Sequence, residues 1–140
     1  MQIDRAKRQN LLLSLIAFNI IVSLGHYIHN IVFLPQYHEP VWITPSLIDA
    51  AWFVMTPFSC IGYFMYLRNR TKFAYWLIYI YCILSLFVLG HYIVTPIRLL
   101  SVTIHSIVLA EAIAAIVLAL YVFALQKSSV NAEAAMSDRE

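Results

Sequence analysis

The chain has 140 residues and a net charge of +2, and 62% of its residues are apolar while only 11% are charged. A water-soluble domain of this size carries more charge on its surface, and a small net charge without a cluster of basic and aromatic residues argues against a nucleic-acid partner. The apolar residues form blocks long enough to cross a bilayer, which requires about 20 residues of helix. We therefore expect an integral membrane protein in contact with lipid.

Four apolar segments predict four transmembrane helices, at about residues 11–34, 45–67, 73–94 and 99–125. Helices are expected because the alternating strands of a barrel are absent. Thr44 and Pro45 predict a sharp start of the second helix, and the short turn at residues 68–72 predicts that the second and third helices are antiparallel neighbours. The sequence thus predicts an all-α four-helix transmembrane bundle at residues 1–127, followed by a disordered polar tail at residues 128–140.

Basic residues are concentrated on one side of the predicted bundle. Eight of the nine lysines and arginines share that side: Arg5, Lys7, Arg8, Arg68, Arg70, Lys72, Lys127 and Arg139. Only Arg98 lies on the other side. The positive-inside rule therefore predicts that both termini are cytoplasmic. The short loops are typical of a multi-pass protein of a prokaryotic inner membrane.

A short motif occurs near the ends of the first and third predicted helices. Residues 23–28 read SLGHYI and residues 88–93 read VLGHYI. The same offset of 65 (91 − 26) that relates His26 to His91 also relates Lys7 to Lys72. We expect two similar helical hairpins, related by a pseudo-twofold axis along the membrane normal.

Titratable side chains gather in the outward half of the bundle. Ionisable groups inside a membrane cost roughly 2–4 kcal/mol each and normally face a cavity or a partner. The outward half holds all five histidines and two carboxylates: His26, His29, His38, Glu39, Asp49, His91 and His105. Helical spacing also predicts two inward-facing polar stripes, Asn19, Ser23, His26 and Asn30 on the first helix and Asp49, Trp52, Thr56, Cys60 and Tyr63 on the second. Together they predict a polar channel or pocket that descends from the outer surface.

Glu111 is the titratable residue predicted to lie deepest in the bilayer. It is about 11 residues into the fourth helix, or about 16 Å at the rise of an α-helix. A protonated carboxyl group bonded to Asn19 or Tyr63 would explain it structurally. A carboxylate at this depth is equally a candidate functional residue.

Metal or haem binding is the leading functional hypothesis. Neutral imidazole is the commonest metal ligand, and carboxylates combine with it around transition metals. The candidate ligands are His26, His91 and His105, with Asp49 or Glu39 beside them and with His29 and His38 as further candidates. In a second form of the hypothesis, haem lies between His26 and His91. The structural alternative makes these two histidines amphipathic residues at the headgroup boundary, and no HExxH, HxxHH or CxxC motif decides between them.

The second predicted helix and its flanks combine Pro40-Val41-Trp42, Asp49, Pro57-Phe58, Tyr63 and a basic turn. This layout resembles the EXPERA-type proteins, four-helix membrane proteins that include sterol isomerases and the sigma-2 receptor. The resemblance implies that Asp49, and Glu111 by its depth, meet the amine of a bound ligand or a carbocation. It favours the binding or isomerisation of a lipophilic, sterol-like small molecule in the bundle. The inward polar stripes and the depth of Glu111 give a candidate ligand pocket lined by Asn19, Ser23, Trp52, Thr56, Tyr63 and Glu111. A third hypothesis is an accessory subunit of a larger membrane complex or a homo-oligomer, and the sequence leaves open whether the protein is an enzyme.

Overall fold

The computed structural model describes the backbone of residues 2–137 and the side chains of residues 5–129. Within this part the chain is all-α, and its long helices are α1 (Gln2–Val32), α2 (Pro45–Leu67), α3 (Thr71–Leu86) and α5 (Val102–Ser137). The connections hold a short helix, α4 (His91–Val94), and three 3₁₀ turns, η1 (Leu34–Tyr37), η2 (Phe87–Gly90) and η3 (Ile97–Leu99). Four segments are long and apolar enough to cross a membrane: Arg5–Val32, Pro45–Leu67, Thr71–Val94 and Val102–Ser129. These four segments confirm the predicted helical spans.

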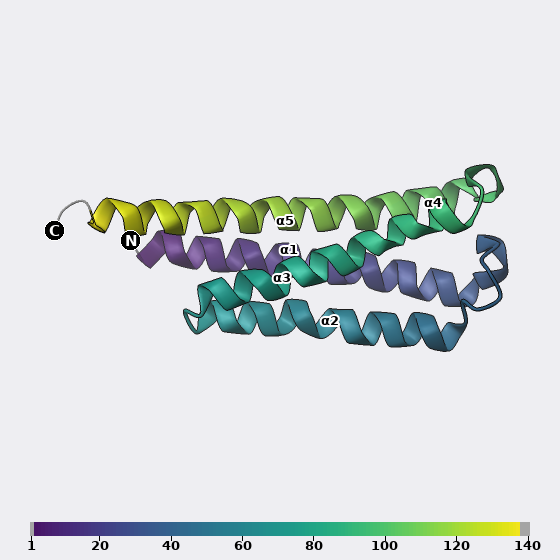
Figure 1. The fold of residues 1–140 in the computed structure, drawn as a ribbon, viewed down its shortest axis with the longest axis horizontal. Coiled ribbons are helices and arrows are strands. Elements are labelled where there is room, and N and C mark those ends of the chain that lie inside the picture. The colour runs from purple at the N-terminus through teal and green to yellow at the C-terminus, as the bar shows by residue number, and fades with distance from the viewer. Residues whose placement is uncertain (1, 138–140) are drawn as a thin grey trace.

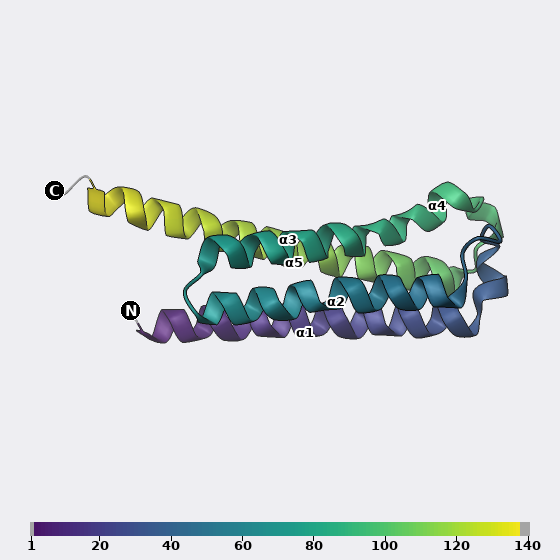
Figure 2. The same ribbon diagram turned by 60° about the horizontal axis from the view of Figure 1, so that its bottom comes forward.

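The helices lie side by side along one long axis (Figure 1), and the second view shows the same arrangement (Figure 2). Helix α2 packs against α3, α1 packs against both α5 and α2, and α3 packs against α5. The N-terminus, the C-terminal part of α5 and the α2–α3 turn share one end of the bundle, which we call the terminal end (Figure 1). The α1–α2 and α4–α5 connections share the opposite end, which we call the histidine end because the five histidines lie in its half.

The outside of the bundle is apolar. Large side chains such as Ile21, Phe53, Ile113 and Leu120 are each more than half exposed. Within each spanning segment, at most 39% of an apolar stretch of 18 residues is buried inside the protein. Because a water-soluble bundle would cover this surface with charge, the exposed apolar side chains indicate an integral membrane protein whose helices face lipid.

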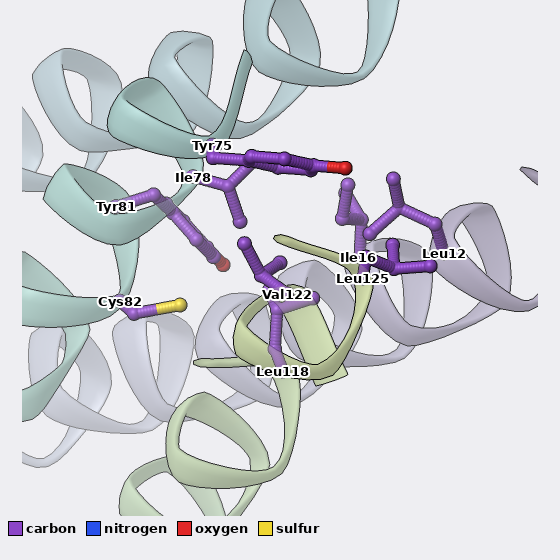
Figure 3. Packing of buried hydrophobic residues seen from close by; sticks show 9 residues of the cluster. All are labelled: Leu12, Ile16, Tyr75, Ile78, Tyr81, Cys82, Leu118, Val122 and Leu125. Atoms are coloured by element: carbon purple, nitrogen blue, oxygen red, sulfur yellow. The ribbon is translucent and has the colours of Figure 1, made fainter. Parts of the chain in front are cut away.

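The half of the bundle near the terminal end is filled by an apolar core. Its buried side chains come from α1, α3 and α5 and are Leu12, Ile16, Tyr75, Ile78, Tyr81, Cys82, Leu118, Val122 and Leu125 (Figure 3). Helix α2 joins this core through a close approach to α3 at Gly62, where a Cβ atom would lie 2.7 Å from Ile78 Cγ1. Gly62 therefore brings α2 and α3 closer together than a larger residue would allow.

Helix α2 has the bounds that the sequence predicts, and Thr44 caps it by accepting a hydrogen bond from the Leu47 N–H. The third span differs from the prediction because η2 interrupts it just before His91. Helix α5 begins three residues late and continues to Ser137, so residues 128–137 are helical where the composition predicted disorder. The residues from 131 to 136 include three alanines, a glutamate and a methionine, which favour helix. Residues 138–140 of the predicted tail lie outside the described residues.

Candidate functional site

The polar stripe of α1 points into the bundle, as predicted. Asn19, Ser23, His26 and Asn30 are all less than a tenth exposed. The stripe predicted on α2 is wrong at Cys60, which is exposed. The buried residues of α2 are instead Ser59 and Gly62, because the close approach at Gly62 turns that face toward α3.

A first histidine–carboxylate pair joins α1 to α5. His26 Nδ1 lies 2.6 Å from Glu111 Oε2, and both side chains are at least nine-tenths buried. The prediction that Glu111 binds Asn19 or Tyr63 is therefore wrong, since Asn19 Oδ1 accepts a hydrogen bond from the Tyr81 hydroxyl at 3.2 Å. Because α5 begins at Val102, Glu111 is nine residues into the helix (111 − 102), or about 13.5 Å. It reaches the level of His26 and does not lie alone beneath it.

A second pair joins α4 to the loop that follows η1. His91 Nδ1 contacts Glu39 Oε1, and the side chain of Glu39 is 2% exposed. The loop turns inward at His38, which has a left-handed backbone with φ of 51°. It is held there by Thr95, whose hydroxyl lies 2.9 Å from the Tyr37 carbonyl oxygen and 3.3 Å from that of His38. The α4–α5 connection therefore positions the carboxylate that His91 meets.

The two pairs meet at the centre of the histidine half. The rings of His26 and His91 are 5.2 Å apart at an angle of 77°. Tyr37 is completely buried, and its ring centroid lies 6.1 Å from that of His26 and 5.1 Å from that of His91. Its hydroxyl shares a 2.9 Å hydrogen bond with His29 Nδ1. We call His26, His91, Glu39, Glu111 and Tyr37 the histidine–carboxylate cluster.

The charge state of Tyr37 follows from its burial. Loss of water around the phenol raises the pKa of Tyr37, and the nearby carboxylates Glu39 and Glu111 raise it further. The side chain of Tyr37 is therefore a neutral phenol, and its hydroxyl can donate or accept a hydrogen bond. His29, which it contacts, is only partly buried.

Four buried polar atoms in and beside the cluster have no hydrogen-bond partner among the described residues. They are His26 Nε2, Asn30 Oδ1 and both carboxylate oxygens of Glu39, of which Oε1 contacts His91 only as an ion pair. Asn30 lies one helical turn from His26 on the same face of α1. Buried polar atoms are nearly always bonded to protein or to ordered water. The cluster therefore has the polar groups needed to bind internal water or another small polar species.

The structure does not bring the predicted metal ligands together. Among the side chains of residues 5–129, no group of three or more histidine, cysteine, aspartate or glutamate residues is placed to hold a metal ion. His26 and His91 are neighbours, but His105 Nδ1 lies 3.2 Å from the Tyr92 hydroxyl and stacks on that ring. His38 is exposed and contacts the Gln36 carbonyl oxygen. The predicted three-histidine site is thus replaced by two histidines that each face a carboxylate.

The residues of the predicted ligand pocket do not lie together in the structure. Asp49 Oδ1 accepts a 2.5 Å hydrogen bond from the Tyr27 hydroxyl, and Trp52 stacks on Tyr27 at 5.2 Å. The Thr56 hydroxyl donates to the Trp52 carbonyl oxygen. The remaining predicted members do not join this group: Glu111 and Ser23 are buried on other helices, Asn19 binds Tyr81, and Tyr63 packs against the apolar core.

Sequence reasoning did not single out Tyr37 as a candidate residue. Its nearness to Glu39 in the sequence was the available signal, since both belong to one short connection. The repeated Gly-His-Tyr motif was informative because its two copies make parallel contacts. Each histidine meets a carboxylate through Nδ1, and each tyrosine meets a titratable residue in the first turns of the next long helix, Asp49 or His105.

Comparisons of the chain with protein-family models, with curated proteins and with solved structures found no match. The resemblance of α2 to EXPERA-type proteins therefore stays a prediction. Any function has to be inferred from the contacts of the chain's own residues.

Proposed function

We propose that the chain is a multi-pass membrane protein with both termini in the cytoplasm, and that its histidine–carboxylate cluster takes up and releases protons from the outer side. The observation that carries this proposal is the direct contact between two buried histidine–carboxylate pairs. Chains of histidines and carboxylates within membrane segments are typical of proton relays and proton-binding sites.

The charges of the cluster explain why it responds to protons. A histidine and a carboxylate that share one proton are neutral as a pair, whether the proton is on the ring or on the carboxyl group. Two such pairs can therefore lie in a medium of low dielectric constant without a net charge. One added proton makes the cluster +1 and one lost proton makes it −1. Because imidazole changes its charge near neutral pH, outer pH acts directly on this balance.

The surroundings of the cluster favour access from one side. Partly buried His29 contacts Tyr37, which in turn packs on both cluster histidines. The unpartnered atoms of His26 and Glu39 provide sites for water that would carry protons between these groups. Toward the terminal end, the apolar core offers few such groups. We infer uptake and release at the outer face without conduction across the membrane.

The cluster also connects proton binding to a conformational element. Glu39 belongs to the loop that Thr95 ties to the α4–α5 connection. When Glu39 takes up a proton, its attraction to His91 weakens, and the loop is then held by the Thr95 contacts and by the packing of Tyr37. The proposed output is a change in the position of this loop on the outer surface.

The test is a titration of ¹⁵N-histidine-labelled protein in lipid nanodiscs, followed by NMR. The signals of His26 and His91 are expected to change together as pH is varied, and His91→Gln is expected to alter the pH response of His26, as for interacting sites. His38→Gln is the matched control, because His38 lies in the exposed loop. Independent titration of the two rings, or no titration between about pH 4 and pH 9, would contradict the proposal. Stoichiometric metal in the same sample, lost in His26→Ala, would replace it with metal binding.

A second candidate function is the binding of a lipophilic amine near Asp49. The carboxylate lies beside the stacked rings of Tyr27 and Trp52, and Phe53 packs edge-on against both rings. A carboxylate next to aromatic faces suits an organic cation. Mass spectrometry of compounds extracted from purified wild type and Asp49→Asn tests this function. Equal retention of any compound by both proteins would exclude Asp49 as its partner.

A further inference from the structure

A cavity at the terminal end lies between the first turns of α3 and the distal part of α5. Its volume is about 360 Å³, near the lower limit of small-molecule pockets. Thr71, Lys72 and Ser129 line it toward the start of α3, and we call these residues the rim. Tyr75, Trp76, Tyr79 and Gln126 line it farther along the two helices, and we call these residues the wall. The cavity is therefore polar and basic at the rim and aromatic along the wall.

The rim has three features that suit a phosphate group. Helix α3 has 16 residues, no side chain caps its N-terminus, and no acidic residue is in its first turn. The N–H groups of Thr71 and Lys72, which both line the cavity, consequently have no acceptor inside the helix, and the helix dipole places partial positive charge there. The lysine ammonium of Lys72 adds a full charge to the same rim. An anion at this position meets free N–H donors and a cation together.

The wall of the cavity suits an apolar chain. Tyr79 is eight residues into α3 (79 − 71), so the cavity extends about 12 Å from the helix end toward the bilayer interior. The Tyr79 hydroxyl donates a hydrogen bond to Gln126 Oε1 at 3.3 Å, which connects α3 and α5 at this depth. Trp76 is 69% exposed on the lipid-facing surface. A molecule that fills the cavity would therefore be polar at the helix end and apolar toward the membrane.

We propose that this cavity binds the headgroup and glycerol backbone of an anionic phospholipid, with the acyl chains lying along Trp76 in the surrounding bilayer. The site is separate from the histidine–carboxylate cluster and does not depend on its proposed function. The lipid belongs to the leaflet at the terminal end, which carries seven of the nine basic residues (Arg98 lies at the other end and Arg139 outside the described residues). Charge complementarity and the depth of the aromatic wall favour a lipid over a free anion.

The first experiment uses native mass spectrometry of the full chain in mild detergent with equal amounts of phosphatidylglycerol and phosphatidylcholine. Wild type is expected to retain phosphatidylglycerol preferentially. Lys72→Gln is expected to reduce this preference about five-fold, the effect of one basic residue near an anionic lipid surface. Lys7→Gln is the matched control, since it removes the same charge from the same end but not from the cavity, and it is expected to leave the preference unchanged.

The second experiment locates the lipid. Trp42→Phe with Trp52→Phe leaves Trp76 as the sole tryptophan, and brominated phosphatidylglycerol in vesicles is expected to quench its fluorescence more strongly than brominated phosphatidylcholine. Equal quenching by the two lipids, or equal effects of Lys72→Gln and Lys7→Gln, would overturn the proposal in favour of nonspecific lipid contact. Displacement of phosphatidylglycerol by millimolar inorganic phosphate would overturn it in favour of a free-anion site.

Discussion

The two halves of the bundle are held together by different forces. Near the terminal end, three helices contribute interlocking apolar side chains such as Leu118 and Val122, and the contacts there require only shape and hydrophobicity. Near the histidine end, a hydrogen-bonded pair connects α1 to α5, and an ion-pair contact connects α4 to the loop after η1. Apolar packing tolerates substitution of one residue by a similar one, whereas a buried polar pair fails when either partner is lost. The difference suggests that the terminal half supplies stability and the histidine half supplies chemistry.

The strongest test of this comparison is Glu111→Ala. It leaves the buried His26 ring without its carboxylate, and the expected loss in the free energy of unfolding is about 4 kcal/mol. Unfolding in detergent, followed by circular dichroism, measures the effect. Because the double variant His26→Ala with Glu111→Ala removes both partners, it is expected to lose less than the sum of the two single variants. Additive losses would show that the pair is not energetically coupled.

Leu118→Ala tests the terminal half in the same way. Leu118 is completely buried in the apolar core, and its truncation leaves a cavity that costs about 3 kcal/mol. The titration of His26 and His91 in NMR spectra is expected to stay as in wild type, because the substitution removes no polar contact of the cluster. A Leu118→Ala protein with altered histidine titration would show that the two halves are coupled and would break the comparison.

The helices could be predicted from the sequence in more detail than the connections between them. Composition and helical period are local properties of the sequence. They predict the four helices, the start of α2 at Pro45 and the inward stripe at Asn19, Ser23 and His26. The interruption at η2 and the inward turn at His38 depend on contacts between distant segments. Local patterns carry no information on such contacts, so the third span was predicted as one unbroken helix.

The composition of the cluster was predicted better than its pairing. Histidine and carboxylate positions in one half were visible, and four of the five cluster residues were named as candidates. The pairing of Glu111 with His26 depends on where α5 begins, and a shift of three residues moves a side chain about 4.5 Å along the axis. Burial of Tyr37 depends on the fold of a loop tied by Thr95, which no periodicity predicts.

Thr95→Val is expected to loosen the histidine half with a smaller effect on stability. It removes the hydroxyl that contacts the Tyr37 and His38 carbonyl oxygens, and the expected cost is about 1–2 kcal/mol. Hydrogen exchange measured by mass spectrometry should become faster in residues 36–44 and stay unchanged in the apolar core. Unchanged exchange in the loop would show that Thr95 does not hold Glu39 in place.

Tyr37→Phe is expected to have the smallest effect and to depend on pH. At neutral pH it removes the hydrogen bond between the hydroxyl and His29, which costs about 1 kcal/mol.

Burial raises the pKa of Tyr37 in the folded protein, whereas the unfolded tyrosine ionises near its usual value of about 10. Above that pH the unfolded state loses its proton first, so the stability that Tyr37 contributes is fully present below about pH 10 and is lost as pH rises toward the folded value. Phenylalanine has no such ionisation, so the difference in unfolding free energy between wild type and Tyr37→Phe should shrink from about pH 8 to about pH 11. If this free-energy difference stayed constant over the interval, water would reach Tyr37, and the histidine half would be solvated like the protein surface.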